Sequence, residues 1–580
     1  MPSRQRRRGD LAVAAALLAT VALAAGADGG AEFDYRKLSG IIIPGFASTQ
    51  LRAWSVLDCP YSPFDFNPLD SVWLDTAKLF SAVNCWLKCM LLEPYNQTDH
   101  PECKSRPDSG LSAITELDPG YITVWKEWVK WCVEFGIEAN AIIAVPYDWR
   151  LPPSMLEERD LYFHKLKLTF EIALKLRGGP SLVFAHSMGN NVFRYFLEWL
   201  KLEIAPKHYI QWLDEHIHAY FAVGAPLLGS TEAVRGALSG TTFGLPVSEG
   251  TARLMFNAFG SSLWLMPFSK HCKADNIYWK HFFEGKAGCP HRQQCDEAEY
   301  ISDYAGWPTD LVNIEVPSVR DGTLFRTIED YDPQSKALVY QLEKYYQGDP
   351  VLNPLTPWER PPIKNVFCIY GIDSKTEVGY YFAPSGKPYP DNWIITDIIY
   401  EFEGSLLSRQ VSYNSLSWCK NWLGAKVNIT RAPQAEHDGS DLQTAMNIDH
   451  HHGQDILPNM TRAPHVKYIT YYEDAESLPG WRTAVWELDK ANHRNIVRTP
   501  VLMRELWLEM WHDMHPDSKS KFVTKAFRGP LRNDDCHWDY GKARCGFPEH
   551  CEYRYVFGDV HLGMSCRLKN TSANLLQQYL

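Results

Sequence analysis

The sequence predicts an α/β fold in which a mostly parallel sheet is covered by helices on both faces. Two observations support this prediction. Short apolar runs typical of buried strands recur at residues 41–43, 141–145, 182–184, 220–223, 366–370 and 466–471. Helical patterns separate several of these runs, at residues 124–135, 161–176 and 192–202. Such alternation of strands and helices is typical of doubly wound sheets.

The pentapeptide Ala185-His186-Ser187-Met188-Gly189 joins one predicted strand directly to one predicted helix. A turn this tight holds its central serine in a strained conformation, with Oγ exposed at the carboxyl edge of the sheet. The small residues Ala185 and Gly189 stand where a bulky side chain would collide with a neighbouring strand or helix. The sequence therefore predicts an α/β-hydrolase fold in which Ser187 attacks an ester.

Composition limits the classes of partner. The 580 residues are 45% hydrophobic, which is enough for one large domain with insertions or for two domains. The formal net charge of −11 argues against a nucleic-acid partner, because phosphate binding needs a basic face. The 21 Trp, 29 Tyr and 26 Phe must mostly be core, but they also suit a protein that works against a lipid surface.

The N-terminus has the pattern of a secretory signal peptide over residues 1–27. Arginines at positions 4, 6, 7 and 8 precede an apolar stretch over residues 11–25, and Ala25-Gly26-Ala27 offers a cleavage site. An uncleaved anchor and a buried helix are the alternatives. We therefore expect the protein in the secretory pathway, in the endoplasmic reticulum lumen or associated with microsomal membranes.

The 14 cysteines suit an oxidising compartment. Four of them crowd into the C-terminal end and predict a disulfide-rich extension, with a zinc site as the alternative although no C-x-x-C pair is present: Cys536, Cys545, Cys551 and Cys566. The compartment would also make four acceptor sequons usable for glycosylation: Asn96, Asn428, Asn459 and Asn570.

Two stretches break the strand and helix rhythm and are predicted to be insertions. The first, residues 59–103, is rich in Pro, Trp and Leu. The second spans residues 226–365, and its start is punctuated by glycines ahead of an aromatic run that ends at Phe268. Glycine-rich sequence directly after a central strand is typical of a mobile lid, and a long surface loop is the alternative.

Four pieces in this order together resemble one family, the lecithin:cholesterol acyltransferases, and especially its plant phospholipid:sterol O-acyltransferase branch. The pieces are Ile43-Pro44-Gly45-Phe46-Ala47-Ser48-Thr49-Gln50-Leu51, Asn84-Cys85-Trp86, Pro146-Tyr147-Asp148-Trp149-Arg150 and the elbow around Ser187. The similarity runs from about residue 38 to about residue 474, and the C-terminal extension is similar to the plant members. The resemblance implies a hydrolase-like domain over residues 28–475 and an extension over residues 476–580.

The resemblance also implies roles for individual residues. Ser187 would accept the acyl group, and the backbone N–H groups of Phe46 and Met188 would stabilise the oxyanion. Cys59 and Cys85 would form a disulfide that closes the first insertion. That insertion would be a membrane-docking element that contacts lipid through Trp73 and Trp86, with core packing as the alternative for Trp73.

The base of a serine, acid and histidine triad is predicted late in the chain, because the histidine comes last in this fold. The run Asp449-His450-His451-His452-Gly453 offers three histidines. Similarity to the family favours His452, then His450, and His437 third. A metal site at the triplet is the alternative, but neighbouring histidines on one loop rarely complete a tetrahedral site alone.

The acid is the point where this sequence departs from the family. Members carry a Gly-Asp-x-Thr-Val-like loop just ahead of the stretch that here begins at Ser415, and residues 403–415 contain no such loop. The junctions near Val124 and near Asp321 are also shorter than the family pattern. A spliced or incompletely predicted gene product explains these differences. Asp373, which follows a predicted strand, is the substitute carboxylate to consider.

The resemblance implies an acyltransferase that moves a fatty acyl chain from a phospholipid to a sterol hydroxyl through an acyl-serine. No metal and no organic cofactor is implied, and the expected partners are the two lipids and a membrane surface, with protein partners unknown. The alternatives are a phospholipase A-type hydrolase that uses water as the acceptor, and a lipid-binding protein of low activity because the acid loop is missing.

Overall fold

The computed structural model describes residues 38–267, 334–401, 411–433 and 466–498 with short gaps, together with residues 325–326 and short strands between residues 538 and 568. The chain divides into two compact units. One consists of Arg36–Met503, and the other combines Met1–Tyr35 with Arg504–Leu580. The larger unit contains the predicted sheet and the residues around Ser187, whereas the predicted signal peptide lies outside the described residues.

The main sheet is mostly parallel. Within the described residues it has eight strands, in the order β13-β14-β15-β10-β9-β8-β1-β7. The strands from β7 to β15 all pair in parallel, whereas β14 and β13 are added antiparallel at one edge. Their bounds are β1 (Ser39–Ile43), β7 (Ile142–Ala144), β8 (Ser181–His186), β9 (Ile217–Val223), β10 (Asn365–Ile372), β13 (Val427–Pro433), β14 (Val466–Glu473) and β15 (Arg482–Asp489).

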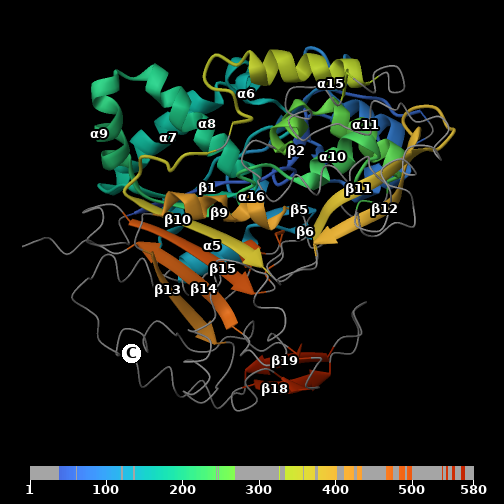
Figure 1. The fold of residues 1–580 in the computed structure, drawn as a ribbon. Coiled ribbons are helices and arrows are strands. Elements are labelled where there is room, and N and C mark those ends of the chain that lie inside the picture. Colours follow the sequence, from blue (N-terminus) through green and yellow to red (C-terminus); the bar gives the residue numbers. More distant parts are fainter. Residues whose placement is uncertain are drawn as a thin grey trace, which may run out of the picture. The chain divides into compact units, whose positions relative to one another are not determined.

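Helices cover both faces of this sheet, as predicted. On one face lie α7 (Tyr162–Arg177), α8 (Met188–Glu203) and α9 (Pro206–His216), which Figure 1 shows grouped together. Phe193 of α8 packs on Tyr220 of β9, with ring centroids 4.7 Å apart. Tyr220 pairs with Val183 across the sheet, so the next residue along β8, Phe184, points to the opposite face, where Trp128 of α5 (Lys126–Glu134) meets it.

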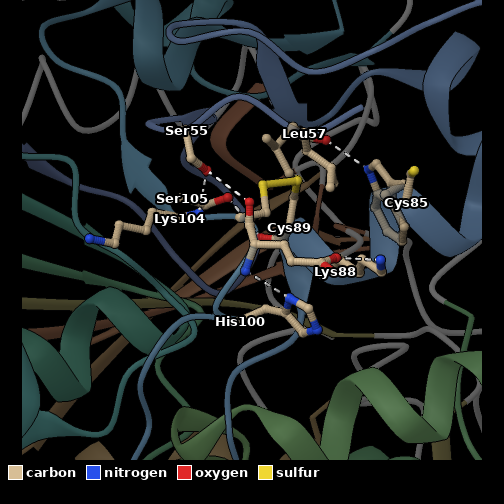
Figure 2. Close-up of a disulfide and its surroundings, with 12 residues drawn as sticks. Ser55, Leu57, Cys85, Lys88, Cys89, His100, Lys104 and Ser105 are labelled. Atoms are coloured by element: carbon tan, nitrogen blue, oxygen red, sulfur yellow. Dashed lines mark hydrogen bonds and ion pairs between the residues drawn. A yellow bond between two sulfur atoms is a disulfide. The ribbon is translucent and has the colours of Figure 1, made fainter. Parts of the chain in front are cut away.

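The 59–103 segment forms a small subdomain before α5. It contains β3 (Ser71–Trp73), α2 (Thr76–Ser81) and α3 (Val83–Met90), and β3 joins β2 (Leu51–Ala53) and β4 (Ser105–Pro107) in a three-stranded sheet. The expected pair Cys59 and Cys85 forms a disulfide with the Cα atoms 5.9 Å apart. A second disulfide joins Cys89 to Cys103, and Figure 2 shows Ser55, Lys104 and Ser105 around Cys89.

In the 224–268 segment the described residues, 224–267, are helical and packed, so this part of the second insertion is not a long surface loop. Helix α10 (Thr231–Leu238), helix α11 (Glu249–Ala258) and the 3₁₀ helix η3 (Gly260–Leu265) follow β9. Most of their residues are buried, among them Phe256, Leu263 and Trp264. Two of the glycines are required by close packing, because a Cβ at Gly229 would lie 2.4 Å from the carbonyl oxygen of Met266, and one at Gly240 would lie 2.0 Å from that of Glu249.

The remaining elements connect these parts. Before β8 they are α4 (Ser112–Thr115), β5 (Glu116–Asp118), β6 (Ile122–Thr123), η2 (Ala139–Ala141) and α6 (Pro153–Asp160). After η3 they are α15 (Ser335–Leu342), η6 (Glu343–Gln347), the hairpin of β11 (Thr376–Pro384) and β12 (Trp393–Glu401), α16 (Tyr413–Ser417), η7 (Trp418–Trp422) and η9 (Ile496–Arg498). A disulfide that was not predicted, Cys368–Cys419, ties β10 to η7.

The sheet extends past residue 475, the expected end of the hydrolase-like domain. Strand β15 pairs with β10 over its whole length, and the larger compact unit continues to Met503. The smaller unit contains the short strands β16 (Trp538–Asp539), β17 (Arg544–Cys545), β18 (Cys551–Tyr555) and β19 (Met564–Leu568). No helix among the described residues is long and apolar enough to cross a bilayer.

Candidate active site

Ser187 has the strained backbone that the elbow predicts. It lies between the last residue of β8 and the first residue of α8, with φ of +52° and ψ of −128°. Two glycines packed against this turn, Gly189 of α8 and Gly45 of the loop after β1, leave no room for side chains. A Cβ at Gly189 would lie 2.5 Å from the carbonyl oxygens of Ile43 and Pro44, and a Cβ at Gly45 would lie 2.9 Å from the Cβ of Ser187. The turn can therefore form only with these small residues.

A histidine that the sequence analysis did not consider contacts this serine. The Nε2 atom of His493 lies 3.0 Å from the Oγ of Ser187, across a sequence separation of 306 residues. His493 follows the end of β15 by four residues. The expected base, His452, lies outside the described residues, as do His450 and His437. The sequence could have indicated His493, because this histidine closely follows β15, the last parallel strand. Residues beyond 475 were expected to belong to the C-terminal extension, so β15 was not predicted.

His186, the residue before the nucleophile, supports the turn that carries His493. Its Nε2 lies 2.8 Å from the carbonyl oxygen of His493, so Nε2 carries the hydrogen and donates it. Burial lowers the pKa of His186 to about 4, with a smaller contribution from the charge of Arg498 and an opposing one from the hydrogen bond to His493, so this imidazole is neutral at physiological pH. Its ring packs edge-on against Trp125 of the segment before α5, with centroids 6.1 Å apart.

The electrostatics around His493 favour the neutral imidazole. Burial is the main cause that lowers its pKa well below the usual range, and His186 and Arg494 lower it further. A neutral His493 can accept a proton at Nε2 only if Nδ1 carries the ring hydrogen. Nδ1 is buried and has no hydrogen-bond partner among the residues described. The carboxylate that orients the histidine of a triad is therefore missing from this part of the structure.

The candidate carboxylates fall in stretches that cannot be placed. Asp373 lies outside the described residues, and so do residues 402–410, which precede the stretch where the family loop is expected. Gly224, with φ of +56°, faces the same ring, because a Cβ there would lie 3.1 Å from Nδ1 of His493. A side chain at position 224 would crowd the edge of the imidazole that needs an acceptor.

The two expected oxyanion donors flank Ser187. Met188 is the first residue of α8, so its N–H is one of the helix N-terminal donors without an intrahelical partner. Phe46 follows Gly45, which approaches Ser187 closely, and Phe46 lines the same cavity as the serine. This arrangement can supply two backbone N–H groups to a developing oxyanion.

A cavity of about 240 Å³ opens at Ser187 and His493. Its walls are mainly apolar and come from the loop after β1, the 59–103 segment, Trp149 and, above all, the 224–268 segment. That segment contributes Pro226, Ala233, Leu245, Val247, Ala252, Met255, Phe256, Phe259 and Leu265. Three charged side chains also line the cavity: Glu232, Arg494 and Arg498. An apolar cavity with a few polar groups beside a reactive serine suits an acyl chain.

The two tryptophans expected to contact lipid are not on the surface. Trp86 is completely buried and its indole N–H donates to the carbonyl oxygen of Val72. This corrects the expectation that Trp86 contacts a membrane, because its ring is part of the core of the 59–103 segment. Trp73 is 6% exposed, lines the cavity and donates from its indole to the carbonyl oxygen of Ala47.

The motif Pro146-Tyr147-Asp148-Trp149-Arg150 anchors the 59–103 segment to the core. The guanidinium of Arg150 is completely buried, forms an ion pair with Asp148 at 2.7 Å and donates to the carbonyl oxygens of Cys89 and Met90 at 3.2 and 3.0 Å. The neighbouring Trp149 lines the cavity and packs edge-on against Phe46 and Trp73, with both ring centroids 5.0 Å away. The motif therefore links that segment to the cavity wall.

The other predicted sites are covered only in part. Asn96 is exposed, and its side chain accepts from the hydroxyl of Thr98, the other sequon residue. Asn428 lies in β13, whereas Asn459 and Asn570 lie outside the described residues. No cluster of possible metal ligands occurs among the residues that the structure describes.

Comparison with known proteins identifies the family. The family model for lecithin:cholesterol acyltransferase matches residues 68–450. This chain belongs to the lecithin:cholesterol acyltransferase family. A phospholipid–sterol O-acyltransferase of Arabidopsis thaliana is 72% identical over 94% of this chain and 94% of its own. A phospholipid:diacylglycerol acyltransferase of Schizosaccharomyces pombe is 26% identical over 61% of this chain and 58% of its own. A lysosomal phospholipase A and acyltransferase of Bos taurus is 32% identical over 34% of this chain and 49% of its own.

The alignment with the Arabidopsis family member also shows a difference in length. It extends over 597 residues, which exceeds the 580 residues of this whole chain. The relative therefore contains residues inside the aligned region that have no counterpart here. This agrees with the expectation that the chain is shorter than the family pattern.

Proposed function

We propose that this chain transfers a fatty acyl group from a phospholipid to a sterol hydroxyl through an acyl-Ser187 intermediate. The observation that carries the proposal is the 3.0 Å contact between Ser187 Oγ and His493 Nε2 at the mouth of an apolar cavity. The Arabidopsis relative is called a phospholipid–sterol O-acyltransferase, which supports phospholipid as the donor and sterol as the acceptor.

In the first half-reaction Ser187 Oγ attacks the carbonyl carbon of a phospholipid ester while His493 Nε2 takes the hydroxyl proton. The N–H groups of Phe46 and Met188 stabilise the oxyanion of the tetrahedral intermediate. Collapse of this intermediate breaks the ester bond, and His493 returns the proton to the departing lysophospholipid oxygen. The acyl chain is then attached to Ser187.

In the second half-reaction a sterol hydroxyl attacks the acyl-serine. His493 takes the hydroxyl proton and returns it to Ser187 Oγ as the sterol ester leaves. The 224–268 segment supplies most of the cavity wall, and we propose that it acts as a lid that excludes water at this stage. Exclusion of water is what favours a transferase over a phospholipase.

We propose that the protein docks on membranes through an apolar set on and beside the 59–103 segment. The set replaces Trp86 in this role, and it consists of Trp54, Val56, Phe64, Leu69, Phe80 and Val83, which are 38–69% exposed. Exposed apolar side chains in one region of a chain can mark an interaction surface. A variant with Trp54→Ser and Phe80→Ser should float less with phospholipid vesicles, whereas Leu176→Ser, which removes an exposed leucine from α7, should not change flotation.

We further propose that the protein enters the secretory pathway and is glycosylated at Asn96. The N-terminal signal pattern, the disulfides Cys59–Cys85, Cys89–Cys103 and Cys368–Cys419, and the exposure of Asn96 support this. Endoglycosidase treatment of the expressed protein should increase its electrophoretic mobility, and Asn96→Gln should reduce that shift.

The decisive experiment uses phospholipid with a labelled acyl group, on vesicles with and without free sterol. We expect a labelled acyl-Ser187 in quenched samples, sterol ester as the main product when sterol is present, and free fatty acid only without it. Label transfer that persists in Ser187→Ala would overturn the nucleophile. Equal fatty acid release in both conditions, without sterol ester, would establish a phospholipase instead.

A second candidate function is lipid binding with very little turnover. The observation that favours it is the buried Nδ1 of His493, which lacks an acceptor among the described residues. Loss of the carboxylate in a serine triad lowers turnover by about four orders of magnitude. Measurable vesicle binding without acyl-Ser187 formation would favour this candidate.

A further inference from the structure

Two arginines follow the histidine that contacts Ser187. Arg494 is adjacent to His493, and Arg498 ends the 3₁₀ turn η9 (Ile496–Arg498). Both side chains line the same cavity as Ser187 and His493. The side chain of Arg494 is exposed to solvent and that of Arg498 is half-buried, so a ligand that enters the cavity can reach both guanidinium groups.

The charged groups on the cavity wall leave an excess of positive charge. The opposing carboxyl group on the wall is Glu232, in the first turn of α10, and it interacts electrostatically with Arg494. Burial raises the pKa of Glu232 to about 7, so much of it is uncharged near neutral pH. The charge of Glu127 in α5 favours the charged form of Arg498, but Glu127 does not line the cavity.

This positive charge opposes the proton transfer expected of His493. After burial and His186, the charge of Arg494 is the third cause that holds the pKa of His493 low, and Arg498 acts in the same sense on His186. A cation near a general base makes the imidazolium harder to form. An anion bound to the two arginines would remove this penalty at the moment when the base must accept a proton.

We propose that Arg494 and Arg498 form the binding site for the phosphate group of the acyl donor. The proposal rests on the proposed function for the identity of the donor. Guanidinium groups bind phosphate oxygens through paired, charge-assisted hydrogen bonds, and they suit this role better than ammonium groups. In a glycerophospholipid the phosphate is a few bonds away from the acyl ester, so a phosphate held at the cavity wall presents the ester to Ser187.

The position of the arginines links donor recognition to the base. Both lie on the short turn that carries His493, and the carbonyl oxygen of His493 is held by His186. A phosphate bound to Arg494 and Arg498 would add a second restraint on this turn. Neutral donors such as diacylglycerol cannot supply the restraint or the compensating charge. The site would therefore select phospholipids among acyl donors.

The test measures binding to the full chain with Ser187→Ala, so that no turnover occurs. The probes are dihexanoyl phosphatidylcholine, dihexanoylglycerol and inorganic phosphate, titrated by calorimetry. Adding Arg494→Gln and Arg498→Gln should weaken binding of the phospholipid at least tenfold and leave binding of dihexanoylglycerol within twofold. Adding Glu232→Gln instead should leave phospholipid binding equal or tighter, because a competing carboxylate is removed.

The matched control is Arg177→Gln. Arg177 ends α7 just before β8 begins, so about 20 Å of strand separate it from Ser187 at about 3.3 Å per residue. This control should bind all three probes like the parent. Equal phospholipid binding by the double arginine variant and the parent, with unchanged thermal stability, would overturn the proposal. So would inorganic phosphate that binds as tightly as the phospholipid, since the site would then be a general anion site.

The outcome can be separated from that of the proposed function. If the unsubstituted chain forms no acyl-Ser187 but phospholipid binding still depends on both arginines, the headgroup site stands and the transferase fails. If acyl-Ser187 forms and the arginine variants bind phospholipid normally, the transferase stands and the headgroup site fails. A thermal denaturation profile of each variant checks that the change in binding is local.

Discussion

The two sides of the candidate site are assembled in different ways. On the side of Ser187, residues that are neighbours in the sequence form the turn. Strand β8 ends, Ser187 adopts φ of +52°, and α8 begins at Met188. On the side of the base, His493 reaches Ser187 across 306 residues, and its Nδ1 has no acceptor within the described part of the chain. A local motif can survive a change elsewhere in the chain that disables its distant partners.

The first prediction tests whether His493 is the base. We expect His493→Gln to lower the rate at which a fluorophosphonate labels Ser187 by about two orders of magnitude, because losing a whole triad costs about 10⁶-fold and losing its acid alone already costs about 10⁴-fold. His452→Gln is the matched comparison and should label at the parent rate. If labelling required His452 and not His493, the base would be His452, as the sequence favoured.

The second prediction concerns the missing carboxylate. A family-like acidic loop inserted between Arg409 and Tyr413 should raise acyl transfer by up to about four orders of magnitude, because a triad without its acid loses about this much. The same loop with its Asp changed to Asn is the control. If the parent and the loop-complete protein are equally active, another carboxylate already orients His493, and Asp373→Asn is the first variant to measure.

The contrast also explains what could be predicted from the sequence. The elbow, the six strand runs and the helices over residues 161–176 and 192–202 depend on local pattern, and β8, α7 and α8 occur close to where they were predicted. His493 depends on the placement of β15, a strand that pairs with β10 more than a hundred residues earlier in the chain. Its tertiary partner was not visible in the local sequence.

The burial of individual tryptophans also could not be predicted from the local sequence pattern. Trp86 and Trp54 are both tryptophans of the same region, yet one is completely buried and the other is 57% exposed. The difference arises because Trp86 lies on the inner side of α3 and donates to Val72, whereas Trp54 follows the end of β2. Residue type predicted an aromatic, apolar region but not which of its rings face outward.

A smaller effect is expected at His186. Its Nε2–H holds the main chain of His493 in place, so His186→Leu should lower kcat by about tenfold, as expected for a lost buried hydrogen bond of about 1–2 kcal/mol, while KM changes little. His186→Gln keeps a donor at a similar position and should recover most of the rate. Equal rates for the Leu and Gln variants would show that the ring acts only by packing.

The last prediction concerns stability and pH. The pKa of His186 is lowered to about 4 in the folded protein, so the unfolded chain binds the proton more tightly. Stability is therefore present above about pH 6.5 and is lost as pH falls toward 4, by about 3 kcal/mol for this residue. Denaturant unfolding at pH 7, 5.5 and 4.5 should show a shallower decline for His186→Leu. An identical decline would mean that other groups, such as His493, dominate this range.

The buried guanidinium of Arg150 has a mechanical consequence. It holds the carbonyl oxygens of Cys89, Met90 and Ser105, while the adjacent Trp149 forms part of the cavity wall. The 59–103 segment is thus coupled to the catalytic cavity by a short, stiff link and not by a flexible tether. We expect the exposed apolar set that we propose to dock on membranes and the cavity to tilt as one rigid body, so the angle at which the protein rests on a bilayer would set the direction from which a lipid enters.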